Sequence, residues 1–207
     1  MKSIRWSIGL LVLVVGIGVF ALNFDKPTFT LFTTSEKATE KPEPITCSGK
    51  PTEGQIEGPY YTKDSPETDV LDVTDVEGAQ LVLTGYVVDT NCEPIVNAWV
   101  DFWQAKPDGK YDNEGYVLRG HQYTDKNGKY QLVTVIPGPY PGRTPHIHVK
   151  VQAKDGDPIL TTQLYFPKVD SNQNDEIYKE SLLIQNPAET DKGYSGTFDF
   201  VIDTTKE

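Results

Sequence analysis

Two of the three histidines in this 207-residue chain lie one residue apart, at the end of the stretch YPGRTPHIH. Thr144 precedes a proline and is therefore biased to extended backbone, so the chain is expected to reach His146 as a β-strand. In a strand, side chains at positions i and i+2 point to the same face, which would place His146 beside His148. Two imidazoles on one face can bind a metal ion.

Two tyrosines are candidates to complete such a site. Tyr140 ends a Gly/Pro-rich loop six positions before His146, and Tyr111 follows the turn 107–110 on a loop, where functional residues are often displayed. Spacing alone does not exclude that Tyr111 is an ordinary loop tyrosine. Neutral imidazole suits iron, copper and zinc, whereas phenolate is a hard anionic oxygen donor that favours a trivalent ion such as Fe(III).

The donor types also indicate what the metal would do. A free tyrosine has a pKa of about 10, so only a strongly Lewis-acidic ion would hold it as phenolate at neutral pH. Two phenolates and one hydroxide would cancel the three charges of ferric iron, and such a centre would activate an organic substrate rather than dioxygen. The alternatives are a copper oxidase, whose Cu(II) favours tetragonal geometry, and a zinc hydrolase, which would be expected to recruit a carboxylate or cysteine first.

The elements that position these side chains are predicted from short runs of β-branched and aromatic residues. Gly, Pro, Asn and Asp separate these runs. The runs predict an all-β fold, an antiparallel β-sandwich whose long loops carry the metal site. The Asn-Gly pair at 127–128 predicts a tight hairpin with positive φ angles between 122–124 and 130–133. The main helical candidate, 175–183, predicts one or two surface turns. The predicted strands are residues 81–88, 98–103, 130–136, 146–152, 160–166 and 197–202.

The first 24 residues are set aside from the fold. Lys2 and Arg5 precede an uncharged apolar run, residues 8–22, that is short for a membrane span of about 20 residues. Residues 19–21 offer small side chains at the spacing that a signal peptidase reads. We interpret residues 1–24 as a signal peptide, or as a signal anchor if uncleaved. The protein is then exported (secreted, periplasmic or in the cell envelope) and contacts a membrane only through an uncleaved leader.

The rest of the chain divides into a linker and a domain. Residues 25–46 are rich in Thr, Lys, Glu and Pro and are predicted to be a flexible linker, whereas residues 47–207 suffice for one domain. Loss of the leader would take the formal net charge from −11 to −13, which argues against nucleic acid as a partner. Cys47 and Cys92 fit a disulfide in an exported protein, the alternative being two unpaired thiols.

Several motifs, in a fixed order, carry a resemblance to a known family. The chain resembles the intradiol ring-cleavage dioxygenases, most closely those similar to protocatechuate 3,4-dioxygenase, and within them the short-looped, exported subgroup. The resemblance covers residues 47–202. It rests on EGPYY (57–61), GYVVDTNCEPIVNAWVDFWQA (85–105), PDGKY (107–111), LRGHQYTDKNGKY (118–130), PGPYPGRTPHIHV (137–149) and TTQLYF (161–166).

The resemblance implies a non-haem Fe(III) centre. Tyr140 is similar to the axial phenolate that an incoming catechol displaces, and His146 to the axial imidazole. Arg143 matches the family arginine that stabilises negative charge developing on the bound ring, and Gln163 resembles a residue near that arginine. The implied iron ligands, completed by an equatorial pair, are Tyr111, Tyr140, His146 and His148.

The implied reaction uses a small catechol-type phenol and O2. The ring is cleaved between its two hydroxylated carbons, and both oxygen atoms are inserted to give a cis,cis-muconate-type diacid. The loop between Tyr140 and His146 is shorter than is typical of the family, and Gly142 stands where protocatechuate enzymes often have tryptophan. No further basic residue stands beside Arg143 to bind a substrate carboxylate, so protocatechuate itself is not assumed.

Other polar and aromatic residues are interpreted as structural. A non-catalytic alternative is also open, because the runs 85–103 and 123–140 have the cadence of the exported β-sandwich modules of the carboxypeptidase-regulatory or transthyretin-like type. Such modules have no reason to keep HIH, Arg143 and Tyr111 together. The residues interpreted as structural are His121 before a hairpin, Trp99 and Trp103 in the core, Asp101 as a hydrogen-bonding partner, and Tyr60 and Tyr61 packed near the site entrance.

Overall fold

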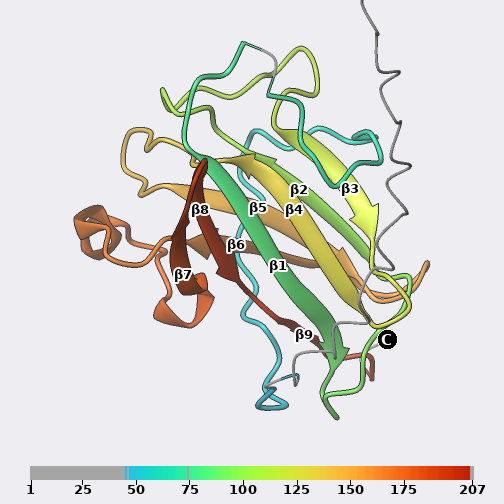
Figure 1. Ribbon diagram of the computed structural model, residues 1–207. Helices are drawn as coiled ribbons and strands as arrows, with labels where there is room; N and C mark the ends of the chain where they lie inside the picture. Colours follow the sequence, from blue (N-terminus) through green and yellow to red (C-terminus); the bar gives the residue numbers. More distant parts are fainter. Residues whose placement is uncertain (1–44, 46, 74, 206–207) are drawn as a thin grey trace, which may run out of the picture. The chain divides into compact units, whose positions relative to one another are not determined.

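The computed structural model describes residue 45, residues 47–73 and residues 75–205 (Figure 1). The predicted leader at 1–24 lies outside the described residues, and so does the predicted linker apart from Ile45, so that both stay predictions. Within the described part of the chain, no helix is long and apolar enough to cross a membrane.

Among the described residues, the strands form two sheets, which confirms the predicted all-β sandwich (Figure 1). The first sheet has the order β4-β1-β8-β7, with β9 also paired to β1, and the second has the order β3-β2-β5-β6. The second sheet is antiparallel throughout, whereas β8 and β9 run parallel to β1. The strands are β1 Gln80–Asp89, β2 Trp99–Gln104, β3 Arg119–Tyr123, β4 Lys129–Val135, β5 His146–Gln152, β6 Leu160–Tyr165, β7 Gln185–Thr190, β8 Gly193–Thr197 and β9 Phe200–Ile202.

The core lies between the two sheets and follows the alternation of the strands. On β5, Ile147, Val149 and Val151 are fully buried in the core. Burying a side chain of this kind stabilises the fold by roughly 1.5–3 kcal/mol. Because side chains alternate along a strand, His146 and His148 point to the outer face of the same sheet. The predicted common face of the two histidines therefore follows from core packing.

The chain before β1 covers this outer face. We call residues 53–68 the cover segment. At one end it contacts β6, where the Gln55 N–H donates to the Thr161 carbonyl (2.7 Å) and the Gln163 side-chain amide donates to the Ile56 carbonyl (3.0 Å). At the other end it contacts β3, where the Thr68 N–H donates to the His121 carbonyl (2.7 Å). The outer face thus becomes a second buried layer in which polar side chains can be enclosed.

The hairpin predicted around residues 127–128 is wrong, although the turn itself is present. β3 pairs with β2 and β4 pairs with β1, so the turn links the two sheets rather than two adjacent strands. Gly128 has a φ of 75°, but Asn127 is not among the positive-φ residues. The Asp125 carboxylate accepts the N–H groups of Asn127 (2.8 Å) and Lys129 (2.9 Å). Turn residues fix a local reversal, whereas core burial decides which strand each arm joins.

Two other predicted segments differ in detail. Residues 197–202 are not one strand, because the regular pairing with β1 is interrupted at Phe198 and Asp199. There the Phe198 carbonyl accepts the Tyr130 hydroxyl (2.8 Å), and the Asp199 carboxylate takes the Tyr86 N–H (2.9 Å) in place of a main-chain partner. Residues 175–183 contain one 3-10 turn, Glu180–Leu182, and no α-helix. A second 3-10 turn lies at Asp170–Asn174.

Candidate metal centre

One row of outward-facing side chains crosses the antiparallel sheet strand by strand. His148 on β5 is directly opposite Trp103 on β2 and Gln163 on β6, and Trp103 is opposite Arg119 on β3. His146 is opposite Tyr165 in the neighbouring row. The register therefore brings side chains from four strands to one site under the cover segment.

The two imidazoles converge through their Nε2 atoms. His146 Nδ1 lies 2.7 Å from the Thr144 carbonyl, which can only accept, so Nδ1 carries the proton and the Nε2 lone pair is free. That atom lies 3.1 Å from His148 Nε2 and 3.4 Å from the Tyr140 hydroxyl. Two ring nitrogens this close must share either a proton or a cation.

The two predicted tyrosines lie at the same place. The Tyr111 ring is 5.8 Å from the Tyr140 ring and 6.3 Å from the His148 ring, measured between centroids. Tyr60 stacks on Tyr111 at 4.4 Å with an interplanar angle of 18°. The structure thus brings together all four side chains that the sequence proposed as metal ligands.

Buried polar atoms without partners mark this site. Among the described residues, the buried side-chain polar atoms that lack a hydrogen bond are Tyr111 Oη, His148 Nδ1 and Trp103 Nε1. Buried polar groups are nearly always satisfied, so Tyr111 Oη, whose one neighbour of this kind is the Tyr140 hydroxyl, has capacity for a further partner. His148 Nδ1 lies on the other side of its ring from the converging Nε2 and does not bear on that partner. The described residues contain no cluster of three or more His, Cys, Asp or Glu side chains suited to a metal. Further protein ligands at the histidine pair would therefore be of another type, and Tyr111 and Tyr140 are the nearby oxygen donors.

The protonation states suit a metal with imidazole and phenolate ligands. Burial, with the charge of Arg143, lowers the pKa of His146 to about 4. Burial and the neighbouring His146 lower the pKa of His148 well below its usual value. Both imidazoles are therefore neutral, which is the form that binds metal. Burial raises the pKa of both Tyr111 and Tyr140, so a strong Lewis acid is needed to form their phenolates.

Arg143 links one tyrosine to the β6 edge of the site. Its Nε pairs with the Asp175 carboxylate at 2.9 Å, and its Nη1 donates to the Tyr140 hydroxyl at 3.1 Å. Its Nη2 donates to Gln163 Oε1, which also accepts the Tyr165 hydroxyl at 3.0 Å. The predicted pair of Arg143 and Gln163 is thus in direct contact beside Tyr140. Asp175, whose side chain is only 1% exposed, was missed because it lies 32 residues from Arg143.

The residues interpreted as structural divide into two groups. His121 Nδ1 lies 3.1 Å from Ser65 Oγ, which donates to Asp101 (2.8 Å), so Asp101 and His121 belong to a polar network away from the histidine pair. Trp103 is buried, as predicted, but not in the cluster between the two sheets. It lies on the outer face and stacks on His148 at 4.7 Å and 10°. Trp99 also lies on the outer face, because it alternates with Val100, and it is only partly buried.

Gly142 is exposed on the loop between Tyr140 and His146. Gly142 has a φ of 79°, and a Cβ atom built there would meet no atom within 4 Å. Tyr60 stacks on Tyr111, and Tyr61 packs on Trp103 at 4.8 Å. Tyr60 therefore borders the proposed ligands, whereas Tyr61 contacts Trp103 and donates to Asp101 (3.0 Å).

Comparison with known proteins gives a consistent result. The model of the Dioxygenase family matches residues 56–204. Catechol 1,2-dioxygenase of Acinetobacter baylyi is 29% identical over 167 residues, which cover 66% of this chain and 53% of that protein. Chlorocatechol 1,2-dioxygenase of Pseudomonas sp. strain P51 is 30% identical over 178 residues, which cover 73% of this chain and 70% of that protein. The chain thus spans about half the length of the first of these relatives.

This chain matches one solved structure over a larger share of that structure's length than it matches either relative. The dioxygenase domain of a dioxygenase carbohydrate-binding protein fusion from Streptomyces sp. SirexAA-E matches with a TM-score of 0.71 and 46% identity. The match covers 75% of this chain and 99% of that one. The residues of the site lie within the range 56–204 that the family match covers.

Proposed function

The chain belongs to the intradiol dioxygenase family, and we propose that it is a non-haem Fe(III) dioxygenase that cleaves catechol-type rings between their two hydroxylated carbons. Both atoms of O2 enter the product, a cis,cis-muconate-type diacid. The observation that carries the proposal is the convergence of the two imidazole Nε2 atoms, 3.1 Å apart, with the Tyr140 hydroxyl 3.4 Å from one of them.

The ligand set supports a ferric ion rather than another metal. Tyr111, Tyr140, His146 and His148 would hold it, because phenolate favours a trivalent ion and neutral imidazole suits iron. When bound, such an ion supplies Lewis acidity toward the two oxygens of a catechol and accepts electron density from its ring. The fold keeps the imidazoles neutral and aims their lone pairs inward, since His146 Nδ1 is fixed by the Thr144 carbonyl.

Tyr140 is the ligand suited to leave when substrate arrives. Its side chain lies on a loop, is partly exposed, and accepts a hydrogen bond from the Arg143 guanidinium. As a phenolate, Tyr140 would take the proton of a substrate hydroxyl and so would serve as the base. Tyr111 is more deeply enclosed and is suited to stay bound.

Arg143 supplies a fixed positive charge beside the reacting ring. Its Nε is paired with the buried Asp175 and its Nη2 contacts Gln163, so the guanidinium is oriented before substrate binds. Such preorganised charge stabilises negative charge that develops on the ring, because no reorganisation is needed during the reaction.

The substrate we propose is a small catechol-type phenol without a required carboxylate. Gly142 has no side chain to narrow the loop beside Tyr140, and a Cβ there would meet no atom within 4 Å. Lys150, a further cation on this face, is paired with Glu57 at 2.6 Å and so is not available to a substrate carboxylate. The non-catalytic module is not favoured, because it gives no reason for converging imidazoles beside a buried tyrosine hydroxyl.

We further propose that the protein is exported, with the Cys47–Cys92 disulfide formed in an oxidising compartment and the linker at 25–46 leading to the domain. An acidic chain with a formal net charge of −11 is not suited to nucleic acid. The partners are then a small phenol and O2, and a membrane only if the leader is retained.

The test is an oxygen-uptake measurement on iron-loaded protein with catechol, hydroxyquinol, protocatechuate and larger plant phenolics, with product identified by mass spectrometry. We expect one O2 consumed per ring and both labelled atoms of 18O2 in the product. Protein that binds no iron, has no visible colour after ferric reconstitution and consumes no oxygen would contradict the proposal.

A further inference from the structure

Arg119 is a buried cation that is not in contact with a carboxylate, since Asp112 and Asp101 attract it only from a longer distance. It is 1% exposed, and none of the acidic residues that the structure describes forms an ion pair with it. Its hydrogen bonds all go to main-chain carbonyls. Nη1 donates to Tyr60 (2.6 Å), and Nε and Nη2 both donate to Asp112 (3.0 and 2.6 Å). A buried charge is unfavourable unless it is paired, so packing alone does not account for an arginine here.

Both carbonyls belong to the surroundings of Tyr111. Asp112 follows Tyr111 in the chain, so its carbonyl fixes the backbone that carries the proposed ligand. Tyr60 is the residue whose ring stacks on Tyr111 at 4.4 Å. The guanidinium carbon is itself 5.9 Å from the centre of the Tyr111 ring, within the range of a cation–π contact. One side chain therefore holds Tyr111 from its backbone and from the ring that covers it.

The backbone is strained at Leu118, immediately before Arg119. Leu118 has a φ of 57°, in the left-handed region, which is unfavourable for a leucine by roughly 1–2 kcal/mol. Arg119 then begins β3 opposite Trp103, the residue that stacks on His148. Arg119 is thus the last member of the row that contains a proposed ligand.

We propose that Arg119 is a positioning residue for the Tyr111 ligand, which it holds through the Asp112 and Tyr60 carbonyls while placing a positive charge beside the bound phenolate. Arg143 also attracts a Tyr111 phenolate, but its hydrogen bond goes to the Tyr140 hydroxyl, so it does not hold the backbone that carries Tyr111. The inference rests on the proposed function, because Tyr111 needs a fixed position and a nearby cation only if it binds the metal as an anion.

The test compares the variants Arg119→Met and Arg119→Lys with a control, Gln122→Met. The control also removes buried hydrogen bonds from β3. Gln122 is 8% exposed and bonds to Gln131, outside the site. Three quantities are measured: ferric-ion affinity by chelator competition, the visible phenolate-to-iron absorption band, and the thermal midpoint of the metal-free protein. Arg119→Met is expected to weaken iron affinity about 10–100-fold and to shift the band, as is typical when the support of a metal ligand is removed.

Gln122→Met should lower the thermal midpoint but leave iron affinity and the band unchanged. Arg119→Lys keeps the charge but not the three-bond geometry, and is expected to be intermediate. Wild-type affinity and an unshifted band in Arg119→Met would overturn the proposal. If metal-free Arg119→Met is unfolded, Arg119→Lys decides in the same way, since wild-type values there also overturn it. A wild-type protein without the band, or a Tyr111→Phe variant that keeps it unchanged, would instead contradict the proposed ligand set.

Discussion

At the scale of single residues, the site depends on which nitrogen or oxygen each side chain turns toward its neighbours. Thr144 fixes the tautomer of His146 through a carbonyl, and Asp175 fixes the direction of Arg143 through an ion pair of 2.9 Å. Neither Thr144 nor Asp175 was predicted, yet each orients a residue that was. A site of this kind is therefore sensitive to changes that keep charge or size but alter geometry.

Replacing Arg143 should affect the reaction more than metal binding. Arg143→Met removes the positive charge and the contacts to Tyr140 and Gln163, so kcat/KM is expected to fall about 10²–10³-fold, the usual effect of losing one preorganised donor. Iron content should remain near that of the wild type. Steady-state oxygen uptake with parallel iron analysis measures both, and Lys126→Met, which removes an exposed cation from the turn between the sheets, is the control. A proportional loss of iron and rate would show that Arg143 acts on the metal site instead.

Loss of a proposed ligand should weaken iron binding as well as lower activity, unlike loss of Arg143. Tyr140→Phe and His148→Ala each remove one donor atom, so both are expected to weaken iron binding and to lower activity. His121→Ala should do neither, because His121 contacts Ser65 rather than the histidine pair. Metal analysis and oxygen uptake on the three purified variants decide the matter. Unchanged iron and turnover in both ligand variants would refute the assignment.

At the scale of elements, the cover segment determines whether the site is buried. Its Gly58 has a φ of 75°, and a Cβ there would lie 3.5 Å from His148 Cε1, an ordinary contact distance. The backbone conformation of Gly58, more than space, therefore requires glycine. Trp103, on β2, stacks on the imidazole of the same His148.

Gly58→Ala should destabilise the fold by about 1–2 kcal/mol, because alanine disfavours the left-handed region. The matched control is Gly54→Ala in the same segment, where φ is not positive and a Cβ would lie 3.6 Å from the Thr161 carbonyl. The control is expected to change stability by less than about 0.5 kcal/mol. Urea unfolding of both variants gives the comparison. Equal losses would mean that the conformation of Gly58 is not the cause.

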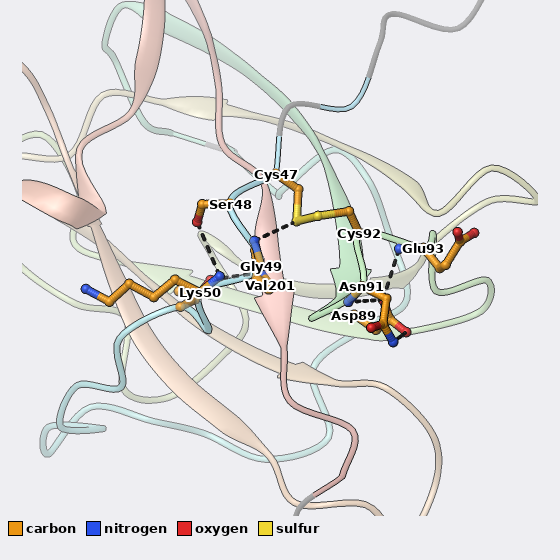
Figure 2. The surroundings of a disulfide bond; sticks show 10 residues. Cys47, Ser48, Gly49, Lys50, Asp89, Asn91, Cys92, Glu93 and Val201 are labelled. Atoms are coloured by element: carbon orange, nitrogen blue, oxygen red, sulfur yellow. Dashed lines mark hydrogen bonds between the residues drawn. A yellow bond between two sulfur atoms is a disulfide. The ribbon is translucent and has the colours of Figure 1, made fainter.

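At the scale of the whole molecule, a disulfide joins the start of the described chain to the turn after β1. Cys47 bonds to Cys92, 45 residues away in sequence, and Cys47 Sγ also accepts the Gly49 N–H at 3.3 Å (Figure 2). Neighbouring β9 is held by the segment before the cover segment, since the Val201 N–H donates to Thr52 Oγ1 (2.9 Å). The bridge therefore fastens the chain that leads into the cover segment.

Removing the bridge should lower stability without altering the chemistry. Replacing both cysteines by serine is expected to reduce the free energy of unfolding by about 2–4 kcal/mol, since the unfolded chain regains the freedom of a long loop. Iron content and oxygen uptake well below the unfolding temperature should match the wild type. Mass spectrometry of the exported protein checks that the bridge forms. A urea midpoint that is unchanged by reduction would contradict this prediction.

The sequence was sufficient for much of the site and less so for its supports. The HIH spacing and the motif order predicted all six proposed functional residues, and the structure brings them together. Trp103, Arg119 and Asp175 were not identified, because their roles depend on cross-strand register and on contacts between distant segments. The hairpin at 127–128 failed for a related reason, because a local turn signal does not specify the sheet that each arm joins.

The sequence by itself determined which donor atoms are present, the period-two pattern that puts His146 and His148 on one face, and the all-β class. These follow from residue types and local backbone preferences, which are properties of short segments. Only the tertiary structure decided that the outer face is enclosed by residues 53–68 and that Arg119 is buried against the carbonyls beside Tyr111. Burial and register arise from the packing of segments far apart in sequence, and no local pattern encodes them.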